Sequence, residues 1–182
     1  WKLMGYRESF CARLSELAGQ NHAEISGGRE RLKVQYRPDC GKANDEASLL
    51  RLLEESQKED MRRMTTLRGE DLNAGFTTKG PHRDDLLVTV QEKSAREYGS
   101  QGQQRTAALA VKLSELDLIR SETGEWPILM LDDVMSELDD RRQQYLLERI
   151  LPVQTLVTTT AHSASWPSAQ RFSISGGSIE LC

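Results

Sequence analysis

The segment that decides the fold reads PILMLDDVMSELD and runs from Pro127 to Asp139. Its first residues, Pro127 to Leu131, form a continuous apolar run, which is typical of a strand buried on both faces in a parallel sheet. The run ends abruptly in two carboxylates, Asp132 and Asp133. Ligands of open α/β sheets bind at the carboxyl ends of the strands, and Mg²⁺ prefers hard oxygen ligands. The segment therefore predicts either a metal-binding strand edge or simply a solvated strand end.

Upstream of this strand, the sequence GSQGQQR from Gly99 to Arg105 opens a long helix-compatible stretch over residues 100–120. Two glycines let the backbone turn closely, Ser100 offers a hydroxyl, and the N–H groups of a first helical turn attract anions. The same pattern also fits a helix that is capped by Ser100 and binds nothing. The residues alone leave both interpretations open.

The remaining segments alternate between helical and strand periodicities, so we expect an α/β protein. The predicted helices cover residues 1–19 with a stop at Gly19, residues 45–66 with Asp45 as N-cap, and residues 138–151. The predicted strands form a hairpin over 22–38 around Gly27 and Gly28, single strands at 86–90 and 154–160, and a closing hairpin over 172–181. Residues 68–71 are predicted to form a polar turn.

Composition narrows the class of protein. Of the 182 residues, 37% are hydrophobic and 29% are charged, as in an ordinary soluble globular protein. No apolar run approaches the roughly 20 residues of a membrane span. Three scattered cysteines fit a reducing cytosolic setting better than a disulfide scaffold or a zinc site. Because the net charge is −4, any contact with DNA would require a local basic face.

The order of the motifs resembles that of the ABC-type ATPase heads. Residues 100–104 correspond to the signature motif, residues 129–133 to Walker B and residues 136–139 to the D-loop. Within that superfamily the motif sequences most resemble those of the RecF family of DNA-repair ATPases. The segments that carry the resemblance are GPHRDD at 80–85, YGSQGQQRT at 98–106 and LDDVMSELD at 131–139. The resemblance is strong over residues 75–160 and general on the flanks.

The resemblance implies an α/β, ABC-ATPase-like fold in two parts. Residues 1–98 would form a helical signature lobe with short antiparallel strands. Residues 99–182 would carry the signature helix, Walker B, the D-loop and the C-terminal strands and helices of the ATPase core. The implied site residues are Asp132 for Mg²⁺, Asp133 as the catalytic group that polarises the attacking water, Ser136 and Asp139 in the D-loop at a dimer interface, and Ser100, Gln101, Gly102 and Gln103 against the γ-phosphate of a nucleotide held by the opposite subunit.

The family further implies a cytoplasmic protein that binds ATP with Mg²⁺, forms a homodimer on ATP and hydrolyses it slowly. It would bind DNA at single-strand gaps or duplex junctions, act with RecR and RecO to load RecA, and serve recombinational repair, replication and the SOS response. The DNA-contacting residues are not implied, and His82 and Arg83 fit a structural turn as well as a contact with nucleotide or DNA. The alternative is a non-catalytic DNA- or partner-docking module of an SMC-like protein.

The chain departs from the family pattern in two places. No phosphate-binding loop of the Gly-x-x-x-x-Gly-Lys-Ser/Thr type occurs, and Gly41-Lys42-Ala43 lacks both the upstream glycine and the hydroxyl residue. Since the family carries this loop near the N-terminus of the full protein, and the chain begins at Trp1, we expect a C-terminal portion that is inactive towards ATP alone. His162 lies two residues beyond the usual switch-histidine position, so a switch role and an exposed loop histidine both remain open.

Overall fold

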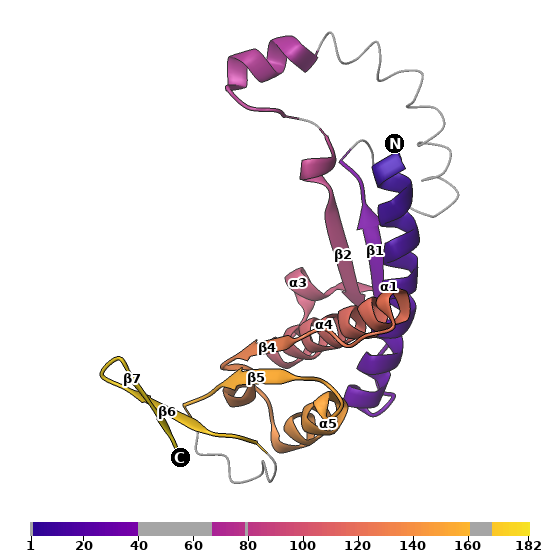
Figure 1. The fold of residues 1–182 in the computed structure, drawn as a ribbon. Coiled ribbons are helices and arrows are strands. Elements are labelled where there is room, and N and C mark those ends of the chain that lie inside the picture. The colour runs from indigo at the N-terminus through magenta and orange to yellow at the C-terminus, as the bar shows by residue number, and fades with distance from the viewer. Residues whose placement is uncertain (1, 40–66, 79, 161–168) are drawn as a thin grey trace. The chain divides into compact units, whose positions relative to one another are not determined.

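A computed structural model describes residues 2–39, 67–78, 80–160 and 169–182 (Figure 1). The chain divides into two compact units, Trp1–Pro127 and Ile128–Cys182. Both units mix helices and strands, which agrees with the predicted α/β class. The predicted boundary between residues 98 and 99 is drawn from motifs rather than from compactness, and it stays a prediction.

In the first unit, two long helices pack with a small antiparallel sheet. The sheet has the order β1-β2-β3, formed by Leu32–Arg37, Asp85–Val90 and Lys93–Ser94. Helix α1 (Lys2–Ser26) packs against both β1 and α4 (Gln101–Thr123). The short elements η1 (Pro81–Arg83) and α3 (Ala95–Tyr98) flank the sheet strands in the chain.

The core of the first unit follows from alternation in its strands. Leu32, Val34 and Tyr36 on β1 are buried while the residues between them are more exposed, so one face of the sheet is covered. Burial of a single leucine or valine side chain stabilises a fold by about 1.5–3 kcal/mol. The buried cluster draws on both helices and both long strands, and its members are Leu14, Ala18, Leu32, Val34, Val90, Ala95, Ala107 and Leu118.

The predicted helix stop at Gly19 is wrong, because α1 continues to Ser26. Gly19 instead lies close to β1, where a Cβ would be 3.3 Å from the Leu32 carbonyl oxygen, tighter than an ordinary contact. The helix ends at Gly27 and Gly28, whose φ angles of 71° and 73° lie in the left-handed region that favours glycine.

The predicted hairpin over 22–38 is therefore half wrong. Its first arm, up to Ser26, is helical, and its second arm is strand β1. The partner of β1 is β2, with Val34 opposite Val88. The predicted strand at 86–90 is confirmed as β2.

The segment that follows the undescribed residues is helical where a turn was predicted. Residues 67–74 form a helix, so the predicted polar turn at 68–71 is wrong. The helix ends at Gly75, which has a φ of 75° and donates its N–H to the Asp71 carbonyl oxygen at 2.9 Å. The predicted helix at 45–66 and its N-cap Asp45 lie outside the described residues.

The second unit contains a short parallel sheet. Strand β4 (Leu129–Asp132) pairs with β5 (Thr155–Thr158), and Asp132 lies opposite Thr158. Between them come η2 (Val134–Glu137) and α5 (Asp140–Ile150), and the unit ends in the hairpin of β6 (Phe172–Ser175) and β7 (Ser178–Leu181). The predicted helix at 138–151, the strand at 154–160 and the closing hairpin are confirmed in kind, with shorter ends.

The predicted burial of the 127–131 run on both faces is wrong in this structure. Met130 is 76% exposed and Ile128 is 63% exposed, whereas Leu131 is buried. The reason is that one face of the two-stranded sheet is open among the described residues, since Leu156, opposite Met130 on β5, is exposed as well. Across the described ranges, no helix is both long and apolar enough to cross a membrane.

Candidate functional site

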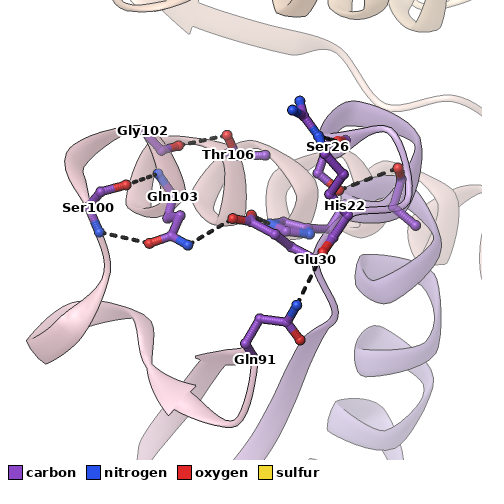
Figure 2. Close-up of polar contacts among 10 residues, drawn as sticks. His22, Ser26, Glu30, Gln91, Ser100, Gly102, Gln103 and Thr106 are labelled. Carbon is purple, nitrogen blue, oxygen red and sulfur yellow. Dashed lines mark hydrogen bonds and ion pairs between the residues drawn. The ribbon is translucent and has the colours of Figure 1, made fainter.

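The start of α4 is a complete capping box. Ser100 accepts a hydrogen bond on its Oγ from the Gln103 N–H at 3.2 Å, and Gln103 accepts one on its Oε1 from the Ser100 N–H at 2.9 Å (Figure 2). The N-cap interpretation of Ser100 is thus confirmed. A helix supplies no acceptor for its first N–H groups, so those of Gln101 and Gly102 remain as donors for an anion at this end.

Gly99 is fixed by packing at the junction of α3 and α4. A Cβ on this residue would lie 2.4 Å from the Ala95 carbonyl oxygen, which leaves no room for any side chain. The Gly99 N–H donates to the same oxygen at 3.1 Å and closes α3. The close approach of the Ala95 carbonyl oxygen therefore favours glycine immediately before the Ser100 cap of α4.

Gln103 reaches out of the signature motif to a residue that sequence reasoning missed. Its Nε2 donates to Glu30 Oε1 at 2.8 Å, and the other Glu30 oxygen lies 3.8 Å from His22 Nε2 (Figure 2). His22 has no exposed side-chain surface. No local pattern marks Glu30, because it lies 73 residues before its partner in the chain.

The Walker B carboxylates lie at the carboxyl end of β4, as predicted. The Thr158 hydroxyl on β5 donates to Asp132 Oδ1, and the Asp133 N–H is 3.1 Å from both the carbonyl oxygen and the hydroxyl of Thr158. Asp133 has a φ of 49°, in the left-handed region that non-glycine residues rarely adopt. Such a conformation costs about 1 kcal/mol or more, and Thr158 holds it in place.

The role of Asp132 as a ligand of a nucleotide-bound Mg²⁺ stays a prediction, with which its exposed position at the end of β4 is compatible. Within the described ranges, no group of three or more His, Cys, Asp or Glu side chains is placed to hold a metal ion. Mg²⁺ in nucleotide sites takes one or two protein carboxylates and completes its shell with phosphates and waters. A single exposed carboxylate at a strand edge is suited to that role.

Ser136 and Asp139 shape the turn that leads from β4 into α5. The Ser136 hydroxyl donates to the Asp133 carbonyl oxygen at 2.9 Å. Asp139 is the N-cap of α5, where its Oδ1 accepts from the Arg142 N–H at 3.0 Å and its Oδ2 pairs with the Arg142 guanidinium. The predicted D-loop residues thus have defined local roles, while their place at a dimer interface stays a prediction.

The GPHRDD segment contains a buried ionic cluster. The Asp84 side chain is 4% exposed and accepts hydrogen bonds from Arg7 Nη1 at 2.6 Å, from the Tyr36 hydroxyl and from the Asp39 N–H at 3.0 Å. Burial and the hydrogen bond to Asp84 raise the pKa of Tyr36 well above its ordinary value. Asp84 therefore has a structural role, tying α1 to β1 and to the start of β2.

His82 and Arg83 lie at the surface beside Asp84. His82 Nε2 is 3.0 Å from the Thr77 carbonyl oxygen, and the Arg83 guanidinium lies over the Phe76 ring, 5.2 Å from its centroid. These residues line a shallow open pocket. Their contact with nucleotide or DNA stays a prediction. His162 and Gly41-Lys42-Ala43 lie outside the described residues.

The signature motif thus opens a capped helix in the first unit, and the second unit carries a parallel strand ending in two carboxylates, followed by a D-loop before the next helix. This combination defines part of an ABC-type ATPase head. No family model matches the chain, but curated relatives do.

The chain is 44% identical over 160 residues to the DNA replication and repair protein RecF of Alkaliphilus oremlandii. It is 47% identical over 156 residues to that of Geobacillus thermodenitrificans. These matches cover 87% and 85% of this chain. The chain belongs to the RecF family, and it spans about two fifths of the length of these relatives (42% and 41%).

Solved structures agree with this assignment. The fold superimposes on the recombination mediator protein RecF bound to ATP in the RecFOR pathway with a TM-score of 0.74 and 33% identity, over 100% of this chain and 46% of that one. The corresponding structure with ATPrS gives a TM-score of 0.75 at 33% identity, over 99% and 46%.

Proposed function

We propose that this chain supplies the signature, Walker B and D-loop side of a composite ATP site in a DNA replication and repair ATPase. The observation that carries the proposal is the pair Asp132 and Asp133 at the carboxyl end of β4, held by hydrogen bonds with Thr158. ATP binding by solved RecF chains of the same fold supports it.

In the proposed mechanism the two carboxylates have separate tasks. Asp132 would hold a Mg²⁺, which would supply positive charge against the phosphates of the nucleotide. Asp133 accepts a hydrogen bond from the attacking water and orients it towards the γ-phosphate. The left-handed backbone of Asp133 suits this task, because strained residues that are held firmly by neighbours often serve active sites.

The signature motif acts on nucleotide held by the opposite subunit. The Ser100 hydroxyl and the N–H groups of Gln101 and Gly102 donate to the γ-phosphate, and Gln103 completes the motif. The N-terminus of α4 favours this anion through its unpaired N–H groups and its dipole. Ser136 and Asp139 link the two sites of the dimer through the D-loop.

For the whole protein we propose the properties of the family. It forms a homodimer on ATP, hydrolyses it slowly, binds DNA at single-strand gaps or duplex junctions, and acts in the cytoplasm with RecR and RecO to load RecA during recombinational repair and the SOS response. The related solved structure, of the recombination mediator protein RecF in the RecFOR pathway, supports this role. The phosphate-binding loop is expected outside this chain.

The test uses a chimera in which this chain replaces the matching 41% of the Geobacillus thermodenitrificans RecF. The substitution Asp133→Asn is expected to lower ATP turnover about 100-fold, as removal of a positioned base does. Asp140→Asn alters an exposed carboxylate in the first turn of α5 and should leave turnover unchanged. If Asp133→Asn retains full turnover, or if DNA binding is the sole activity and survives Ser100→Arg, the chain is a docking module instead.

A further inference from the structure

Glu30 lies in the loop between α1 and β1, between the Gln103 side chain of the signature motif and the buried ring of His22. One carboxylate oxygen accepts from the Gln103 amide at 2.8 Å, and the other lies 3.8 Å from the ring of His22, which is fully buried (Figure 2). The Glu30 side chain is itself 26% exposed. The helix dipole favours a carboxylate near a helix N-terminus, but a carboxylate beside a site proposed to bind a γ-phosphate would repel that second anion. This placement calls for a positive reason.

The donors and acceptors around Gln103 provide that reason. A side-chain amide has an acceptor side and a donor side. A carboxylate only accepts hydrogen bonds, and the Ser100 N–H only donates. With Glu30 on one side and Ser100 on the other, just one orientation of the Gln103 amide satisfies both neighbours. The reverse orientation would place oxygen against oxygen and N–H against N–H.

The loop that carries Glu30 is anchored on both sides. Gln91 Nε2 donates to the Arg29 carbonyl oxygen at 3.1 Å, and the Gln91 N–H donates to that of Arg31 at 2.9 Å (the first of these bonds is drawn in Figure 2). On the other side, Arg29 Nε donates to the Ser26 carbonyl oxygen at 2.9 Å. Glu30 is thus held at a defined place by the β2–β3 turn and by the end of α1.

We propose that Glu30 is a positioning residue for the signature motif, which acts by holding the Gln103 amide in a single orientation. In this orientation the Gln103 side chain accepts the hydrogen bond of the Ser100 N–H. The Ser100 hydroxyl and the N–H groups of Gln101 and Gly102 are then the donors presented to the γ-phosphate. The other carboxylate oxygen lies 3.8 Å from Nε2 of the buried His22. The functional consequence rests on the proposed function, whereas the positioning itself does not.

The first test measures amide hydrogen exchange of Ser100 in the 182-residue chain without nucleotide. Glu30→Ala should speed exchange of the Ser100 N–H about tenfold, as expected for the loss of one charge-assisted hydrogen bond in the network. The Arg142 N–H is the internal control, because it also donates to a capping side chain, that of Asp139 at the start of α5 in the second unit. Glu30→Gln should restore much of the protection, since its amide oxygen can still accept from Gln103.

A double-mutant cycle separates positioning from general destabilisation. If Glu30 acts through Gln103, then Glu30→Ala should have no further effect on Ser100 exchange once Gln103→Ala is present. Equal effects of Glu30→Ala in both backgrounds would overturn the proposal. Unchanged exchange of Ser100 in the Glu30→Ala single variant would overturn it as well.

The second test uses the chimera with the Geobacillus thermodenitrificans RecF. Glu30→Ala should raise the ATP concentration for half-maximal dimerisation about tenfold, in line with the loss at the signature motif. If Ser100 exchange responds to Glu30→Ala while Asp133→Asn leaves ATP turnover intact, the proposed function fails and the positioning stands. If Asp133→Asn abolishes turnover and Glu30→Ala leaves both Ser100 exchange and dimerisation unchanged, the positioning fails alone.

Discussion

The two compact units differ in how completely their own residues bury their apolar surface. In the first unit, α1, α4 and the antiparallel sheet surround a contiguous core, and Leu14 and Ala18 are almost wholly buried. In the second unit, the sheet that carries Asp132 leaves Met130 and Leu156 more than half exposed. The difference indicates that the first unit is held by its own packing, whereas one face of the sheet that presents the carboxylates lies open among the described residues.

The largest expected effect comes from the core of the first unit. Leu14→Ala should lower the free energy of unfolding by about 2–5 kcal/mol, because it opens a cavity at a side chain that is 1% exposed. Met130→Ala in the open sheet should change it by less than about 0.5 kcal/mol. Urea unfolding followed by circular dichroism measures both. Similar losses for the two variants would contradict the contrast between the units.

A second, smaller effect is expected in the polar contacts. Asp84→Asn should cost about 2 kcal/mol, because it weakens charge-assisted hydrogen bonds to a nearly buried group. Asp85→Asn is the matched control, since its carboxylate is exposed and next in sequence. In the second unit, Thr158→Val removes the exposed hydrogen bond to Asp132 and should cost less than about 1 kcal/mol. A loss at Thr158 as large as that at Asp84 would show that the second unit is as tightly built as the first.

The smallest effect is expected in the short helix at residues 67–74. Hydrogen bonds from the side chain and the N–H of Thr78 lower the pKa of Asp71 below its ordinary value. A lowered carboxyl pKa stabilises the fold above the ordinary value, and this stabilisation is lost as the pH falls through the lowered pKa. The protection of the Gly75 N–H, taken relative to the intrinsic exchange rate at each pH, should therefore fall as the pH drops below the ordinary aspartate pKa. The Asp71→Asn variant should lack this acid dependence, and a variant that keeps it would refute the assignment.

The local signals in the sequence predicted the elements that carry the motifs. The cap at Ser100 was one of two interpretations of the pattern, and it is a local feature, because the Ser100 side chain accepts from an N–H within the first turn. The strand ending at Asp132 was expected because its apolar run is continuous. Both features depend on residues close together in the chain, so the sequence is sufficient to find them.

The predictions that were wrong or incomplete depend on contacts between segments far apart in the chain. Glycine is typical of a helix end, but Gly19 lies inside α1, where its lack of a side chain permits the close approach of the Leu32 carbonyl oxygen. Glu30 escaped notice because its contact with Gln103 joins segments far apart in sequence. The exposed face of β4 could not be foreseen from its apolar run, since the elements that pack on a face of a sheet are not encoded in the strand itself.

The central claim is that this chain forms one side of a composite ATP site. In the chimera with the Geobacillus thermodenitrificans RecF, Asp133→Asn and Ser100→Arg should each abolish ATP turnover, because one affects the water-orienting carboxylate and the other the signature motif of the opposite subunit. Mixed in equal amounts, the two inactive variants should regain about a quarter of wild-type turnover, since half of the dimers then hold one intact site of two. A mixture that forms dimers on ATP and stays inactive would contradict the composite site.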